Sequence, residues 1–164
     1  MKRFSISSPE TRNHIHEWLF QQALKFEGLI NLRYKFVDIS LNGKNLGIYA
    51  LEEFFDKRLI ENNKLREGLI VKPSYLNEDK RVFLYQQKNT LKDSSKSNSY
   101  ELLNNLLSSF KASQLQIESI FDIEKTAKYF ALATLFGGQH GHLKENFVCY
   151  FNPITNLLEQ IGYD

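Results

Sequence analysis

The dipeptide Asn42-Gly43 limits the folds open to this chain of 164 residues more than any other feature. It lies between two apolar, strand-like runs, one ending at Leu41 and the other beginning at Leu46. Asn-Gly is the strongest short-range indication of a hairpin, because a type I′ turn needs positive φ at both central residues. The sequence therefore predicts an antiparallel β-hairpin over residues 32–51, with Gly43 at positive φ.

The rest of the chain is predicted to mix helices, short strands and turns, which is an α+β arrangement. Ser8 and Pro9 suit the start of a helix, and Gly28 is placed to end it. The other expected elements are a helix over 54–63, a short strand over 69–72 ended by Pro73, a candidate strand over 81–86, a mobile loop over 92–99, helices over 100–110 and 123–135, a glycine-rich turn over 137–142 and a second hairpin over 147–163.

Composition excludes several classes of protein. Hydrophobic residues make up 42% of the chain and aromatic residues 13%, which is enough to build a core and argues against disorder. The net charge of +2, with both signs well mixed, argues against a dedicated nucleic-acid binder. Cys149 is the single cysteine, so an internal disulfide is excluded. No apolar stretch approaches the roughly 18 residues that a membrane span needs.

Several short motifs occur in a fixed order along the chain. They are Asn42-Gly43 followed by Gly47, Tyr49 and Glu53, then Leu69 to Lys72, Tyr129 to Gly138, Asn146-Phe147 with Tyr150, and Ile161 to Asp164. In this order they resemble the CotH family, whose members are reduced, atypical relatives of protein kinases. The resemblance spans nearly the whole chain, and it rests on the shared order because each motif alone is short.

The resemblance implies a truncated, atypical protein-kinase-like fold and a site for ATP and Mg²⁺. Phosphoryl transfer needs a cation on the nucleotide phosphates and oxygen ligands for the metal. By resemblance Lys72 supplies the cation, and Glu53 pairs with Lys72 and positions it. Asn146 and Asp164 are the implied metal ligands.

One position departs from the family pattern. The family's loop carries an Asp a few residues before the Asn, where it orients the acceptor hydroxyl, but the segment before Asn146 contains no Asp. His140 and His142 flank Gly141 there, and a neutral histidine can act as a base near pH 7. Two readings stay open: His142 or His140 replaces the missing Asp, or the protein transfers no phosphate.

Simpler interpretations stand beside these roles. Lys72 reads equally well as a solvent-facing lysine at a strand end, and Glu53 as one of a solvated pair with Glu52. His140 and His142 could also be incidental residues of a glycine-containing turn, or two ligands of a zinc ion for which the sequence offers no nearby third ligand.

The sequence thus predicts a partial CotH-like kinase domain over residues 1–164, which would transfer phosphate to a hydroxyl group of a coat or envelope protein. The alternative is an inactive kinase-like scaffold of a coat or cell-envelope assembly. A bacterial, exported or spore-coat setting is implied by the resemblance alone. Because an apolar, strand-like run stops at Asp164, we expect a truncated chain whose isolated form is inactive.

Overall fold

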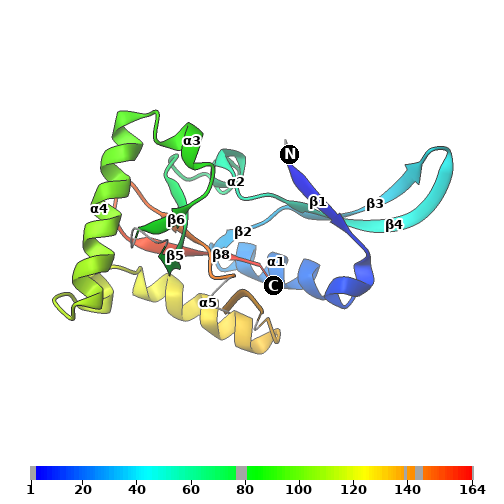
Figure 1. Cartoon of the computed structure of the whole chain (residues 1–164). Helices are drawn as coiled ribbons and strands as arrows, with labels where there is room; N and C mark the ends of the chain where they lie inside the picture. The colour runs from blue at the N-terminus through cyan, green and yellow to red at the C-terminus, as the bar shows by residue number, and fades with distance from the viewer. Residues whose placement is uncertain (1–2, 77–80, 139, 143–145, 164) are drawn as a thin grey trace.

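The computed structural model describes residues 3–76, 81–138, 140–142 and 146–163 (Figure 1). It confirms the α+β class, with two sheets and helices around them. In chain order the elements are β1 (Phe4–Ser7), η1 (Pro9–Arg12), α1 (His16–Phe26), β2 (Ile30–Asn31), β3 (Tyr34–Leu41), β4 (Lys44–Glu53), α2 (Lys57–Asn62), β5 (Leu69–Leu76), β6 (Val82–Leu84), α3 (Gln87–Thr90), α4 (Ser94–Lys111), η2 (Ile117–Ser119), α5 (Ile123–Leu135), η3 (His140–His142), β7 (Cys149–Phe151) and β8 (Leu158–Gly162).

The predicted hairpin at Asn42-Gly43 is confirmed. Strands β3 and β4 are antiparallel, and Asn42 and Gly43 have φ of 52° and 78°, as a type I′ turn requires. Strand β1 pairs with the far side of β4, so the three-stranded sheet has the order β1-β4-β3. The tip of the hairpin projects away from the rest of the domain (Figure 1).

Replacing Gly43 with valine should lower the free energy of unfolding by about 1–2 kcal/mol, the usual cost of forcing an L-residue into left-handed backbone. A Cβ atom at Gly43 would meet no other atom within 4 Å, so the cost is conformational rather than a clash. Urea unfolding measures the change. Lys44→Val, one residue along at an exposed position, is the control and should change stability by less. Equal losses in the two variants would contradict the turn assignment.

The five-stranded sheet has the order β2-β8-β7-β5-β6. The predicted second hairpin is confirmed, since β7 and β8 are antiparallel, and β2 lies parallel to β8. Strand β5 does not end at Pro73 as predicted but continues to Leu76. The pairing of β5 with β6 shifts between Lys72 and Leu76, and such an irregularity is where a strand tolerates proline.

The two faces of the five-stranded sheet carry separate cores. Leu69 and Val71 of β5 pack into a cluster that includes Leu103 and Leu107 of α4. Ile70, on the opposite face of β5, packs into a cluster that draws its other members from β2, α2, β7, β8 and the segments around them. Lys72 follows Ile70 by two residues along β5, and side chains two residues apart on a strand share one face, so the Lys72 side chain lies on this second face.

Two helix predictions were wrong in detail. The first helix is split, because Asn13 and His14 adopt left-handed backbone with φ of 48° and 61° between η1 and α1. The loop predicted over 92–99 is largely helical instead, because α4 begins at Ser94. Asp93 caps this helix by accepting hydrogen bonds from the backbone N–H groups of Ser95 and Lys96.

Among the described residues, no helix combines the length and the apolarity that a membrane span requires.

Candidate functional site

Glu53 ends β4 and is almost fully buried at 2% exposure. Its carboxylate accepts a hydrogen bond from Nε of Arg33 at 3.0 Å and another from the Arg33 backbone N–H at 3.2 Å. The carboxylate also forms an ion pair with the Arg33 guanidinium. The hydrogen bond that the Arg33 side chain donates to Glu53 raises the pKa of Arg33 above its usual value. The predicted partner of Glu53 was Lys72; the bonds that the structure gives its carboxylate come from Arg33.

Lys72 lies on β5 opposite Phe83 of β6. Its ammonium group is 6.0 Å from the centroid of the Tyr85 ring, within the range of a cation–π contact. Burial raises the pKa of Tyr85 to about 12, so the phenol stays neutral at physiological pH. An aromatic ring therefore lies beside the charged group of Lys72.

An aromatic cluster, defined here as Phe55, Tyr85 and Tyr163, joins the segments that carry the predicted site residues. The ring centroids of Phe55 and Tyr85 are 5.3 Å apart, and those of Phe55 and Tyr163 are 5.2 Å apart. Phe55 follows Glu53 by two residues, Tyr85 contacts Lys72, and Tyr163 follows β8 directly. The ends of β4 and β8 and the charged end of Lys72 therefore meet in one region of the molecule.

The loop before β7 reaches the same region. Asn146 donates a hydrogen bond from Nδ2 to the carbonyl oxygen of His140 at 3.3 Å. A Cβ atom on Gly141 would overlap the carbonyl oxygen of Tyr163 and would lie 2.9 Å from the hydroxyl of Tyr129. Gly141 is therefore needed for close approach of two backbone segments, whereas the sequence suggested a role in turning the chain.

Of the two histidines in the loop, the structure describes the side chain of His140 only. His140 is exposed and lines a cavity of about 340 Å³ together with His16 and Glu17. The side chain of His142 and the whole of Asp164 lie outside the described residues. Within the part of the chain that the structure describes, no three His, Cys, Asp or Glu side chains gather as a metal cluster, so the zinc reading gains no support there.

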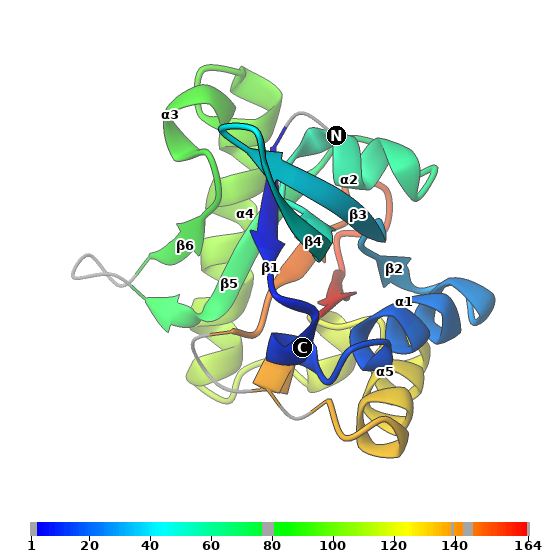
Figure 2. The same cartoon turned by 90° about the vertical axis from the view of Figure 1, so that its right-hand side faces the viewer.

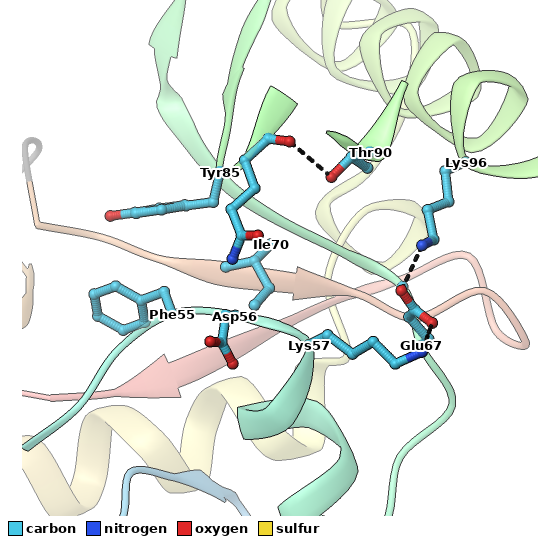
Figure 3. Close-up of a pocket in the computed structure, with 10 residues that line it drawn as sticks. Phe55, Asp56, Lys57, Glu67, Ile70, Tyr85, Thr90 and Lys96 are labelled. Atoms are coloured by element: carbon cyan, nitrogen blue, oxygen red, sulfur yellow. Dashed lines mark hydrogen bonds and ion pairs between the residues drawn. The ribbon is translucent and has the colours of Figure 1, made fainter. Parts of the chain in front are cut away.

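A pocket of about 230 Å³ borders the aromatic cluster (Figure 3). Phe55 and Tyr85 line one end of it. At the other end Glu67 lies between Lys57, whose ammonium is 2.6 Å from the carboxylate, and Lys96. Burial alone would raise the pKa of Glu67, but the hydrogen bonds from Lys57 and Lys96 outweigh it and lower that pKa. The pocket thus combines two aromatic rings with an ion-pair network.

Sequence reasoning missed this pocket. Lys57, Glu67 and Lys96 belong to no motif and come from three separate segments. The side chain of Lys96 could not be placed near Glu67 while residues 92–99 were predicted as a loop. Its position depends on α4, and Asp93 was the residue that could have indicated the start of this helix, because it is a typical helix cap.

Comparison with known proteins identifies the family of this chain. The family model described as CotH kinase protein matches residues 11–164, which is almost the entire chain. A search of curated proteins found no match. The family match covers the hairpin, the strand with Lys72, the loop with Asn146 and the end of β8, and the chain therefore belongs to the CotH kinase protein family.

Proposed function

We propose that this domain binds ATP with Mg²⁺ where the ends of β4 and β8 meet Lys72, and that it transfers phosphate to a hydroxyl group of a protein. The observation that supports this proposal is the aromatic cluster, which brings Lys72, the strand end with Glu53 and the strand end before Asp164 together. By resemblance to the family, the acceptor is a coat or cell-envelope protein.

Each candidate residue has a role that its chemistry allows. Lys72 would bind the nucleotide phosphates, and Glu53 would position this region through Arg33. The hydrogen bond of Asn146 uses its amide nitrogen, which leaves the side-chain oxygen Oδ1 as a ligand of the kind that Mg²⁺ prefers. Together with Asp164 it would hold the metal, which when bound neutralises charge on the phosphates.

Replacing Lys72 with methionine should weaken the binding of ATP·Mg²⁺ by about tenfold or more, since a charge-assisted contact to phosphate contributes roughly 1.5–3 kcal/mol. Methionine keeps much of the length of the side chain and removes its charge. Isothermal titration calorimetry of the purified protein with ATP and MgCl₂ measures the affinity. Lys111→Met, at the exposed end of α4, is the matched control. Equal affinities in the Lys72 variant and the wild type would overturn the nucleotide site.

A second function, a kinase-like scaffold without transferase activity, is favoured by one observation. The loop from Gly138 to Asn146 has no Asp to orient an acceptor hydroxyl. A protein that binds ATP·Mg²⁺ normally but transfers no phosphate to itself or to envelope proteins would support the scaffold over the enzyme.

A further inference from the structure

A groove of about 690 Å³ lies at the edge of the molecule, away from the pocket of Figure 3. Strand β2 and the start of β3 form its floor, and the C-terminal ends of α1 and α2 flank it (Figure 2). Its volume falls within the roughly 300–1,000 Å³ of sites that bury a drug-sized ligand. The groove is therefore large enough to hold a short peptide segment.

The groove carries positive charge. Its cationic residues are Lys25, Arg33, Lys35 and Lys64, and among the described residues that line it none is acidic. Arg33 is neutralised by Glu53. The three lysines are exposed and take part in no ion pair with any residue that the structure describes.

Neighbouring groups do not cancel this charge. Glu27, next to the groove, lies 4.0 Å from Lys128, and Glu61 lies 3.6 Å from Lys57. The C-terminus of a helix carries about half a negative charge. The two helix ends beside the groove therefore contribute less negative charge than the three lysines contribute positive charge. The groove keeps a positive potential, so its complementary ligand is anionic.

An open strand edge borders the groove. In the described part of the chain β3 pairs with β4 and with no other strand. Glu53 donates its backbone N–H to the carbonyl oxygen of Arg33, so Arg33 faces β4. Because bonded and non-bonded residues alternate in an antiparallel pair, the backbone groups of Tyr34 and Phe36 point away from β4. Such an edge can accept a further strand from an extended peptide.

The other strand of the floor is closed. Asn63 accepts a hydrogen bond from the backbone N–H of Asn31 at 3.1 Å and donates one to the carbonyl oxygen of Asn31 at 3.0 Å. These two bonds occupy the edge of β2 just as a neighbouring peptide group would. Of the two strands beside the groove, β3 is therefore the one with an open edge in the described part of the chain.

We propose that this groove binds an extended, acidic segment of a partner protein, which adds to the edge of β3 and places its carboxylates near Lys25, Lys35 and Lys64. The proposal goes beyond phosphoryl transfer, since binding needs no nucleotide. A peptide fits better than single-stranded nucleic acid. Tyr34 is the single aromatic residue among the described lining residues and is 5% exposed, so it offers no face on which a base can stack.

The test is peptide binding to the 164-residue chain without nucleotide. The probe is a short fluorescein-labelled peptide of alternating glutamate and serine, followed by fluorescence anisotropy at about 0.05 M salt, where surface charges are weakly screened. The variant Lys25→Glu/Lys64→Glu should bind about tenfold more weakly than the wild type, because two attractive charges become repulsive. Lys44→Glu/Lys111→Glu carries the same change in net charge at exposed sites outside the groove and should bind nearly as well as the wild type.

Two further probes test the peptide assignment. A peptide with glutamine in place of glutamate should bind poorly, and so should an N-methylated peptide that cannot donate backbone hydrogen bonds. Thermal unfolding verifies that both double variants are folded. Equal weakening by the two double variants, absence of binding by the acidic peptide, unchanged binding after N-methylation, or tighter binding of oligouridylate through the same lysines would each overturn the proposal.

Discussion

Replacing Glu53 with alanine is expected to lower the free energy of unfolding by about 3 kcal/mol, near the lower end of the range for breaking a buried ion pair. The loss leaves the backbone N–H of Arg33 without its acceptor and the guanidinium without its counter-charge. The Arg33 side chain is 32% exposed, so water recovers part of the cost and the upper end of the range does not apply.

The control for this measurement is Glu101→Ala. Glu101 pairs with Arg81 at 2.6 Å, but both side chains are about half exposed, so its loss should cost less than about 1 kcal/mol. Urea unfolding of both variants gives the comparison. A loss for Glu53→Ala no larger than that for Glu101→Ala would show that the buried pair does not hold the end of β4 to the start of β3.

In a form of the protein that transfers phosphate, replacing His142 with alanine is expected to lower the rate of transfer by about 10²-fold or more, the usual scale for losing a general base. The loop before Asn146 offers no Asp, and Lys144 in it would be cationic at neutral pH. His142 is preferred over His140 because it is closer in sequence to Asn146. His140, in addition, lines the cavity with His16 and Glu17. Autophosphorylation with ATP and MgCl₂ serves as the assay while the substrate is unknown.

The readout separates a base from a binding residue. Affinity for ATP·Mg²⁺ should stay nearly unchanged in His142→Ala, whereas Lys72→Met should lower it. His140→Ala is the matched control and should keep most of the activity. Full activity in both histidine variants would mean that the loop supplies no base and that positioning alone supports the reaction.

Local patterns in the sequence identified the elements whose boundaries depend on local chemistry. Asn42-Gly43 gave the hairpin because its turn type allows few other residues, and the helix over 123–135 was predicted with its observed ends. The prediction for residues 92–99 was wrong because the serines and lysines of this segment suggested a loop. The decisive residue was Asp93, whose carboxylate caps α4.

The partner of Glu53 shows why the site was harder to predict than the fold. A regular two-residue hairpin would place Glu52 opposite Arg33. The register shifts by one residue between Ile39 and Ser40, where Gly47 has φ of 84°, and this shift places Glu53 opposite Arg33 instead. No pattern near Glu53 indicates a shift that occurs at the distant end of the hairpin. The aromatic cluster was missed for a related reason, since Phe55, Tyr85 and Tyr163 come from three separate segments.

The bonds from Asn63 to Asn31 have a counterpart at the opposite end of the five-stranded sheet. There Asn104 of α4 accepts a hydrogen bond from the backbone N–H of Val82 at 2.9 Å, and the Tyr100 hydroxyl donates one to the Val82 carbonyl oxygen at 2.8 Å. Side chains thus occupy backbone groups on both outer strands, where unpaired groups would otherwise recruit a second chain and seed aggregation. These side chains leave fewer open backbone groups on the outer strands of the larger sheet, so strand pairing with a partner is expected at the smaller sheet, as proposed above for β3.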